Sequence, residues 1–224
     1  MNSLEQYFLA NRGPLMNKWM HYFDIYDRHL ARFRNQSPVM LEIGVYHGGS
    51  LGMWKDYFGP GARIIGVDIN PRAKRFADEQ VTIEIGDQSD REFLRQLRAR
   101  HSRIDILLDD GGHTVEQQRI TFEEMFSAVA HDGVYLIEDV HTSYWPEYGG
   151  GLGEGASFVE FCKRLVDDLN AWHVREWDQE QRSEVAQAAH SISFYDSVIA
   201  IEKRVKAPPF ARMTGKLSFL SLDE

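Results

Sequence analysis

The stretch Val39-Met40-Leu41-Glu42-Ile43-Gly44-Val45-Tyr46-His47-Gly48-Gly49-Ser50 decides the fold, because a short apolar run passes directly into a glycine-rich turn. Apolar runs of this length are typical of strands that are buried on both faces of a parallel sheet. Glycines after such a strand let the backbone turn sharply and approach a ligand closely. Ligands of open parallel sheets bind beyond the carboxyl ends of the strands, so we expect this turn to line a binding site.

Four further apolar runs follow, and amphipathic segments of helical character separate them. The runs are ARIIGVDI (62–69), VTIEIGD (81–87), IDILLDD (104–110) and GVYLIED (133–139). Five strands with helical connections predict an α/β fold, a Rossmann-like, doubly wound and mostly parallel sheet. The segment SISFYDSVIAIEKR (191–204) contains two more runs around a short polar break, which predicts an antiparallel hairpin that completes seven strands.

Three parts of the chain are expected. Residues 1–37 predict a helical extension or lid, because aromatic residues recur at helical spacing, at Trp19, Tyr22, Phe23 and Tyr26. Residues 38–204 form the main α/β domain. Residues 205–224 predict a tail that lies on the surface or on another subunit of a homo-oligomer, a dimer or larger. Five glycines between residues 149 and 155 predict a flexible lid after the fifth strand, with a simple linker as the alternative.

Composition narrows the class of protein. With 43% apolar and 26% charged residues, the 224-residue chain has the composition of a globular protein. A net charge of −9 argues against a nucleic-acid partner, which a basic surface normally recognises. A single cysteine, Cys162, rules out a disulfide framework within the chain. The start of the sequence resembles no signal peptide and no run is long enough to span a membrane, so we expect a cytoplasmic protein without a membrane partner.

The glycine-rich turn is not the dinucleotide-binding fingerprint, because Tyr46 stands where that pattern needs its second glycine. The pattern E-x-G-x-x-x-G-x-S resembles instead the first motif of class I S-adenosylmethionine (SAM) methyltransferases. The resemblance implies that acidic and amide residues after the next two strands hold the ribose hydroxyls and the adenine. The expected cofactor-binding residues are Glu42, Gly44, Tyr46, Gly48, Ser50, Asp68, Asp87, Gln88 and Asp109. Each alone fits a loop glycine or a helix cap, Asp87 most readily.

Two acidic pairs, each followed by a histidine, end the fourth and fifth strands: Asp109-Asp110 precedes His113, and Glu138-Asp139 precedes His141. Neighbouring strands lie about 4.8 Å apart, so these carboxylates would crowd one edge of the sheet. Their repulsion favours a hard divalent cation with oxygen ligands, Mg²⁺ first and Mn²⁺ as the alternative. Solvated helix caps and ion pairs, with histidines that make only structural hydrogen bonds, are the competing interpretation.

The motifs DDGGHT, IEDVHTSYW, LEIGVYHGGSL and KWMHYFDIYDRHL together resemble the metal-dependent sugar O-methyltransferases of macrolide biosynthesis and related cephalosporin-hydroxylase-like proteins. The likeness covers roughly Lys18 to Lys203. It implies metal ligands at Asp110, Glu138 and Asp139 and a catalytic base at His113. His141 remains a candidate for the same role, because it also lies within three residues of an expected ligand.

The sequence therefore predicts an enzyme, a SAM- and Mg²⁺-dependent O-methyltransferase. Its expected partner is a saccharide or glycoside, a glycosylated natural product or an oligo- or polysaccharide. Tyr144, Trp145 and Tyr148 offer ring faces on which a sugar can stack, although ordinary packing explains them equally well. A metal-dependent hydroxylase and a non-catalytic SAM-binding module are the alternative functions.

Overall fold

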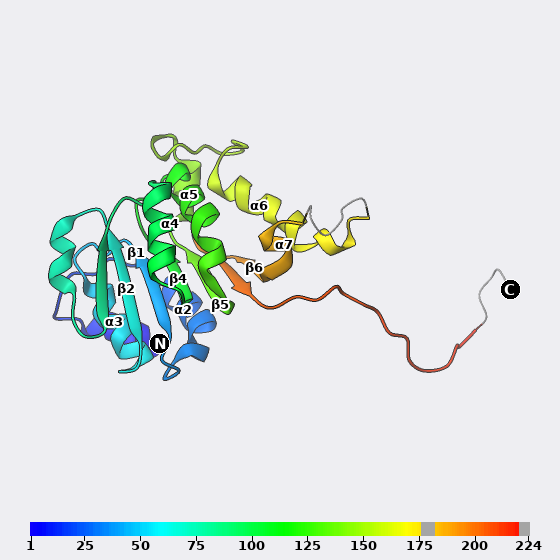
Figure 1. Cartoon of the computed structure of the whole chain (residues 1–224), viewed down its shortest axis with the longest axis horizontal. Helices are drawn as coiled ribbons and strands as arrows, with labels where there is room; N and C mark the ends of the chain where they lie inside the picture. Colours follow the sequence, from blue (N-terminus) through cyan, green and yellow to red (C-terminus); the bar gives the residue numbers. More distant parts are fainter. Residues whose placement is uncertain (176–181, 220–224) are drawn as a thin grey trace.

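The computed structural model describes residues 1–175 and 182–219 and shows one seven-stranded sheet between two layers of helices (Figure 1). The strand order is β3-β2-β1-β4-β5-β7-β6; β1 to β5 are parallel, and β7 runs antiparallel to both β5 and β6. The α/β class and all seven expected strands are confirmed. The strands are β1 (Val39–Ile43), β2 (Arg63–Asp68), β3 (Val81–Ile85), β4 (Ile104–Asp109), β5 (Val129–Ile137), β6 (Ala189–Phe194) and β7 (Ile199–Lys203).

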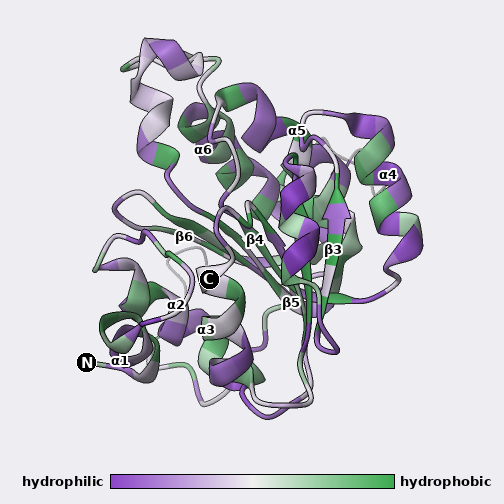
Figure 2. Cartoon of the chain, turned by 90° about the vertical axis from the view of Figure 1, so that its left-hand side faces the viewer, coloured by the Kyte–Doolittle hydropathy of each residue, from purple (hydrophilic) through white to green (hydrophobic). Residues whose placement is uncertain are grey.

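Each face of the sheet has its own helices and its own apolar core (Figure 2). Alternate residues of β1 divide between the two cores, since Leu41 and Ile43 enter one and Met40 the other. One face is covered by α1 (Ser3–Ala10), α2 (Tyr22–Leu30) and α3 (Gly49–Phe58), and the other by α4 (Arg91–Arg100), α5 (Val115–Met125), α6 (Phe158–Leu169) and α7 (Glu184–Ala188). Short 3₁₀ helices lie at Ala31–Phe33, Pro71–Phe76, Phe126–Ala128, Val140–Tyr144, Pro146–Tyr148 and Ala171–His173.

The expectation of a helical segment from residue 1 to residue 37 is wrong for residues 11–21, which form neither helix nor strand. The break follows from Gly13-Pro14: the Asn11 side chain accepts a hydrogen bond from the Gly13 amide, and Pro14 disfavours helical backbone before it. Trp19 consequently lies outside the helices and is exposed, whereas Tyr22 and Tyr26 of α2 are buried in the core that the sheet shares with α3.

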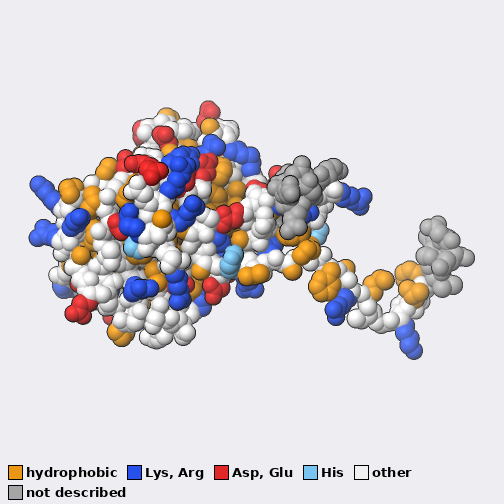
Figure 3. Space-filling view, in the orientation of Figure 1, with side chains coloured by type: hydrophobic (Ala, Val, Ile, Leu, Met, Phe, Trp, Pro, Cys, Tyr) orange, Lys and Arg blue, Asp and Glu red, His pale blue; other side chains and the backbone are white. Residues whose placement is uncertain are grey.

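The described part of the expected tail, residues 205–219, contains no helix or strand and extends away from the body of the chain (Figure 1). Near its start, Lys206 Nζ still donates a hydrogen bond to the carbonyl oxygen of Leu169 (3.3 Å), whereas the part beyond projects from the body with hydrophobic side chains along it (Figure 3). The apolar side chains of Met213 and Leu217 are exposed. Residues 220–224 of this predicted tail lie outside the described residues. Within the described ranges, no helix is long and apolar enough to cross a membrane.

Candidate active site

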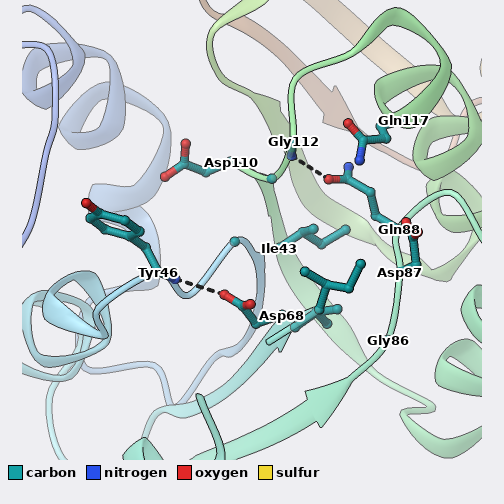
Figure 4. Close-up of a pocket in the computed structure, with 13 residues that line it drawn as sticks. Ile43, Tyr46, Asp68, Gly86, Asp87, Gln88, Asp110, Gly112 and Gln117 are labelled. Atoms are coloured by element: carbon teal, nitrogen blue, oxygen red, sulfur yellow. Dashed lines mark hydrogen bonds between the residues drawn. The ribbon is translucent and has the colours of Figure 1, made fainter. Parts of the chain in front are cut away.

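The site forms where the first five strands end. The register of the sheet pairs Ile43 of β1 with Val67 of β2 and with Asp109 of β4, and it pairs Asp109 with Ile137 of β5. The residues that follow these strands therefore meet at one edge. A cavity of about 230 Å³ opens there beside the ends of β1, β2 and β3 (Figure 4). Of the expected cofactor-binding residues, this pocket is lined by Gly44, Tyr46, Asp68, Asp87 and Gln88.

Glycines are required where two loops approach one another beneath the pocket. Gly44 has a φ of 93°, and a Cβ atom there would lie 1.9 Å from the carbonyl oxygen of Asp110. A Cβ atom at Gly111 would lie 1.8 Å from Oε1 of Gln88. A side chain at either position would collide with these neighbours, so the backbone of the two loops forms the base of the pocket.

The carboxylate of Asp68 is held in a fixed orientation at the wall of the pocket. Its Oδ2 accepts hydrogen bonds from the amides of Val45 (3.0 Å) and Tyr46 (2.9 Å), and its Oδ1 accepts one from Asn70 (2.8 Å), as the Tyr46 contact in Figure 4 illustrates. The loop after β1 and the end of β2 are thereby locked together. An anionic acceptor is thus presented to the cavity.

Asp87 is not the cap of α4. Its Oδ1 accepts hydrogen bonds from the amide and hydroxyl of Ser89, whereas Asp90 caps the helix by accepting from the amides of Glu92 and Phe93. The helix-cap alternative for Asp87 is therefore wrong. Its carboxylate lies at the pocket wall, beyond the end of β3.

Gln88 links the pocket to the acidic end of β4. Its amide nitrogen donates to Asp109 Oδ1 (3.0 Å), and its amide oxygen accepts from the Gly112 amide (2.7 Å; Figure 4). Asp109 is buried, and burial raises its pKa to about 7. Its Oδ2 has no hydrogen-bond partner.

Four of the expected cofactor-binding residues do not line the pocket: Glu42, Gly48, Ser50 and Asp109. Glu42 accepts hydrogen bonds from Ser50 Oγ (2.8 Å) and Trp54 Nε1 (2.9 Å) beneath the loop, where burial raises its pKa to about 7. Gly48, with a φ of 79°, precedes α3 and leaves room for the ring of Phe76. The structure gives these residues a supporting position, and direct contact with a cofactor stays a prediction.

The second half of the site is an acidic cluster into which a lysine projects. Lys18 Nζ lies 2.5 Å from Asp110 Oδ2 and 3.0 and 2.9 Å from the two carboxylate oxygens of Glu138. Although burial acts to lower the pKa of Lys18, the two carboxylates raise it above its ordinary value. Glu138 is buried, and burial together with Asp110 raises its pKa well above the usual range.

Two tyrosines of α2 hold the same cluster. The Tyr26 hydroxyl donates to Glu138 Oε1 (2.5 Å), and the Tyr22 hydroxyl donates to Asp139 Oδ1 (2.5 Å). Asp139 adopts a left-handed backbone, with a φ of 53°, directly after β5. Consecutive residues of a regular strand face opposite sides of the sheet. Because the chain leaves β5 at this point, the side chains of Glu138 and Asp139 can lie on the same side.

The residues present fit a divalent cation. All three expected ligands, Asp110, Glu138 and Asp139, line a cavity of about 210 Å³, to which they offer hard carboxylate oxygens. The Lys18 ammonium lies between two of them as a stand-in cation. A slightly different set of potential metal ligands lies close together in the structure: one ligand atom from each of Asp110, His113 and Asp139 lies within 4.8 Å of the others. Both oxygens of Glu138, by contrast, are engaged by Lys18 and Tyr26.

The two candidate histidines lie on opposite sides of Asp139. His113 Nε2 is 3.5 Å from Asp139 Oδ2 and 3.9 Å from Asp110 Oδ1, and its buried Nδ1 has no hydrogen-bond partner. His141 Nδ1 forms a short hydrogen bond with Ser197 Oγ and lies 3.9 Å from Asp139 Oδ1. His113 therefore faces two expected metal ligands, and His141 only one.

The orientation of His113 does not depend on glycine flexibility. His113 itself adopts the left-handed conformation, with a φ of 57°, whereas Gly111 and Gly112 have no positive φ and lie against the side-chain ends of Gln88 and Gln117. Non-glycine residues in this conformation are uncommon and tend to occur at functional sites. Tyr46 at the first cavity, Asp139 at the second, Ser197 beside His141 in a neighbouring cavity, and His113 adopt it here, and so do Asn35 and Ser37 elsewhere.

Lys18, Tyr22, Tyr26 and Ser197 were not predicted as site residues. Tyr22 and Tyr26 are spaced i and i+4 on α2, so one helical face carries both hydroxyls toward the sheet edge, whereas Lys18 precedes the helix and gave no such signal. Ser197 gave no comparable signal, because it follows the break of the hairpin. Nearby, Trp145 packs against His141 with ring centroids 4.8 Å apart, and Tyr144 is exposed, so an open aromatic surface borders the cluster.

Known proteins resemble this chain in sequence and in fold. A family model described as a methyltransferase domain matches residues 41–140. The chain is 37% identical over 198 residues to 8-demethyl-8-(2-methoxy-alpha-L-rhamnosyl)-tetracenomycin-C 3'-O-methyltransferase of Streptomyces olivaceus, an alignment that covers 83% of this chain and 50% of the relative. It is 42% identical over 197 residues to mycinamicin VI 2''-O-methyltransferase of Micromonospora griseorubida, which covers 83% and 49%.

Among solved structures, the MycE methyltransferase of the mycinamycin biosynthetic pathway, in complex with Mg and SAH, superimposes with a TM-score of 0.79 at 30% identity. That match covers 90% of this chain and 54% of the MycE chain. The chain thus spans about half the length of the curated relatives it matches. From the matched domain, the shared fold and these identities together, we conclude that the chain carries a methyltransferase domain and is similar over that part to sugar O-methyltransferases.

Proposed function

We propose that this chain is a SAM- and Mg²⁺-dependent O-methyltransferase that acts on a sugar hydroxyl of a glycosylated natural product or of an oligo- or polysaccharide. One observation carries the proposal: the pocket at the ends of β1 to β3 and the acidic cluster share Asp110. A methyl donor in the first cavity would lie next to an acceptor in the second. The relatives named as sugar O-methyltransferases, and MycE complexes with Mg and SAH, support the same assignment.

The cofactor half orients the donor. SAM, when bound, supplies an electrophilic methyl group. Asp68 accepts hydrogen bonds from the vicinal ribose hydroxyls, because its carboxylate is already fixed toward the pocket by three amides. Asp87 and Gln88 line the wall beyond β3, where they face the adenine. Gly44 lets the turn after β1 pack directly against the Asp110 backbone at the base of the pocket.

The acidic half orients the acceptor. Asp110, Glu138 and Asp139 hold Mg²⁺, or Mn²⁺ in its place, and the ion supplies Lewis acidity toward the sugar hydroxyl. Tyr22 fixes the carboxylate of Asp139 through a 2.5 Å hydrogen bond, which limits the positions its other oxygen can take. The aromatic surface around Trp145 offers ring faces to the sugar.

His113 accepts the proton of the attacking hydroxyl at Nε2, which faces Asp110 and Asp139. His141 is the second candidate, but its Nδ1 is committed to Ser197. A cytoplasmic location and a homo-oligomeric state stay predictions from the sequence.

The test is a transfer assay with SAM carrying a labelled methyl group, Mg²⁺ and a panel of deoxyhexose glycosides, sugar-bearing macrolides and oligosaccharides. We expect label in the sugar of at least one class and equimolar S-adenosylhomocysteine. SAM binding without transfer to any sugar hydroxyl would refute the acceptor class. Consumption of oxygen by the iron-loaded protein would point to the hydroxylase alternative.

A further inference from the structure

Residues 11–20 form a largely exposed segment, one side chain of which is buried among the carboxylates of the active site. The structure describes all ten residues, and none of them is buried as a whole residue. The side chain of Lys18, however, is only 4% exposed, because it passes between the carboxylates of Asp110 and Glu138. The ammonium group is thus the charged attachment of this segment to the acidic cluster, beside an edge-on contact between the rings of Trp19 and His141 with centroids 6.0 Å apart.

This segment forms one wall of the acceptor cavity. The cavity of about 210 Å³ has Asn17, Lys18 and Trp19 on one side and the three acidic residues on the other. The same segment lies against the start of α3: a Cβ atom at Gly49 would be 2.4 Å from Met16 Cγ and 2.5 Å from the Leu15 carbonyl oxygen. The segment thus runs from the glycine-rich turn across to the acidic cluster, on the face of the sheet that carries α1 and α2 (Figure 2).

The Lys18 ammonium occupies the position that a divalent ion needs. Three carboxylate oxygens, one from Asp110 and two from Glu138, lie within 3.0 Å of Nζ. One positive charge against Asp110, Glu138 and Asp139 leaves the cluster with excess negative charge. A divalent ion would compensate more of it, and the ammonium and the ion cannot share the same oxygens at contact distance.

We propose that Lys18 is a tethered cation that holds residues 11–20 closed over Asp110 and Glu138, and that a divalent ion displaces it and releases the segment. Release moves one wall of the acceptor cavity, so the site opens to a bulky glycoside only after the ion has bound. The inference rests on the proposed function, because it takes the divalent ion from there. It adds that the metal controls access to the site as well as the reaction in it.

Competition of this kind has a measurable consequence. A ligand that binds only the released state has its apparent affinity reduced by the fraction of molecules in that state. If the closed state holds more than about nine tenths of the molecules, removal of the ammonium should strengthen Mg²⁺ binding at least about tenfold. The variant Lys18→Met removes the charge and keeps an unbranched side chain of similar length. Lys55→Met is the matched control, since Lys55 forms an exposed ion pair with Asp78 away from the site.

The experiment combines calorimetric titration with Mg²⁺ at pH 8 and hydrogen exchange of the full chain followed by mass spectrometry. In the unaltered protein, Mg²⁺ should increase exchange in the peptide that spans residues 11–20. Lys18→Met should show that increase without metal and should bind Mg²⁺ at least about tenfold more tightly, whereas Lys55→Met should match the unaltered protein.

Exchange in this peptide that Mg²⁺ leaves unchanged or decreases would overturn the inference, and this measurement needs no variant. Equal or weaker Mg²⁺ binding by Lys18→Met would also overturn it, because Lys18 would then support the site rather than compete for it. In either case, continued Mg²⁺-dependent methyl transfer by the unaltered protein would leave the proposed function intact. Failure of every protein to bind Mg²⁺ would refute both.

Discussion

The two halves of the site are built in different ways. The cofactor half uses loops that directly follow the consecutive strands β1, β2, β3 and β4, and its geometry comes from glycines and from backbone amides that fix Asp68. The acceptor half uses carboxylates at the ends of β4 and β5, but its walls include Lys18 and Tyr22, which are remote in sequence, and Ser197 near the end of the chain holds Tyr22 by a hydrogen bond. The first half is local in sequence and the second is assembled by tertiary packing.

Because the two halves are built from different residues, we expect cofactor binding and methyl transfer to respond to different variants. Variants in the acceptor half should abolish transfer and leave the cofactor bound, whereas variants in the cofactor half should first weaken binding. Each prediction below tests whether the two halves are independent. Asp110 lines both cavities, so a variant of this residue should affect both halves.

The largest effect is expected from Asp139→Ala. It removes an expected metal ligand and the acceptor of the Tyr22 hydrogen bond, so methyl transfer should be abolished. SAM affinity, measured by calorimetry, should be unchanged because Asp139 does not line the cofactor pocket. Excess EDTA should reproduce the loss in the unaltered protein, and Asp167→Ala on the exposed side of α6 should retain full activity. Full activity in EDTA would leave the acidic cluster with a structural role alone.

The next effect concerns the proton acceptor. His113→Ala should lower turnover by about 10²- to 10⁴-fold, the usual contribution of a general base, with SAM and Mg²⁺ binding largely retained. His141→Ala should cost less, since that imidazole is bound to Ser197. Rates measured against pH should fall in acid for the unaltered protein and lose this dependence in His113→Ala. If His141→Ala loses both rate and pH dependence instead, the base is His141.

The residues that could be predicted from the sequence divide in the same way between the two halves. The meeting of Asp68, Asp110 and Asp139 at one edge could be predicted from the strand pattern, because strand ends of a parallel sheet share one edge, whereas the roles expected of them came from the family resemblance. Lys18 could not, because its position depends on how residues 11–21 fold, and aromatic spacing outweighed the Gly13-Pro14 break in the prediction. The supporting position of Glu42 was also missed, since the pattern that marks the loop does not say which side chains face the ligand.

A moderate effect is expected in the cofactor half. Asp68→Ala removes charged hydrogen bonds worth roughly 1.5 to 3 kcal/mol each, so SAM should bind at least about tenfold more weakly. Loss of the contacts to the Val45 and Tyr46 amides should add to this by loosening the glycine-rich turn. Affinity of the apoprotein for Mg²⁺ should stay the same if the halves are independent. A calorimetric SAM affinity equal to that of the unaltered protein would remove Asp68 from the site.

The smallest effect on binding, and a distinct effect on stability, is expected from Glu42→Gln. Glu42 lies beneath the pocket, so SAM affinity should change less than about threefold, under 1 kcal/mol. Burial raises the pKa of Glu42 to about 7, above its ordinary value of 4.5. The stability contributed by its neutral form is therefore complete below about pH 4.5 and is lost as the pH rises through 7, by about 3 kcal/mol.

Glutamine does not titrate, so the melting temperature of the unaltered protein minus that of Glu42→Gln should fall between pH 5 and pH 8 in EDTA. Glu116→Gln, at an exposed position of α5, should show a difference that hardly changes with pH. A constant difference for Glu42→Gln would mean that Glu42 is ionised in the folded protein throughout this range. A large loss of SAM affinity would instead show that the buried carboxylate is coupled to the cofactor through Ser50 and the start of α3, and that the cofactor half extends below its visible pocket.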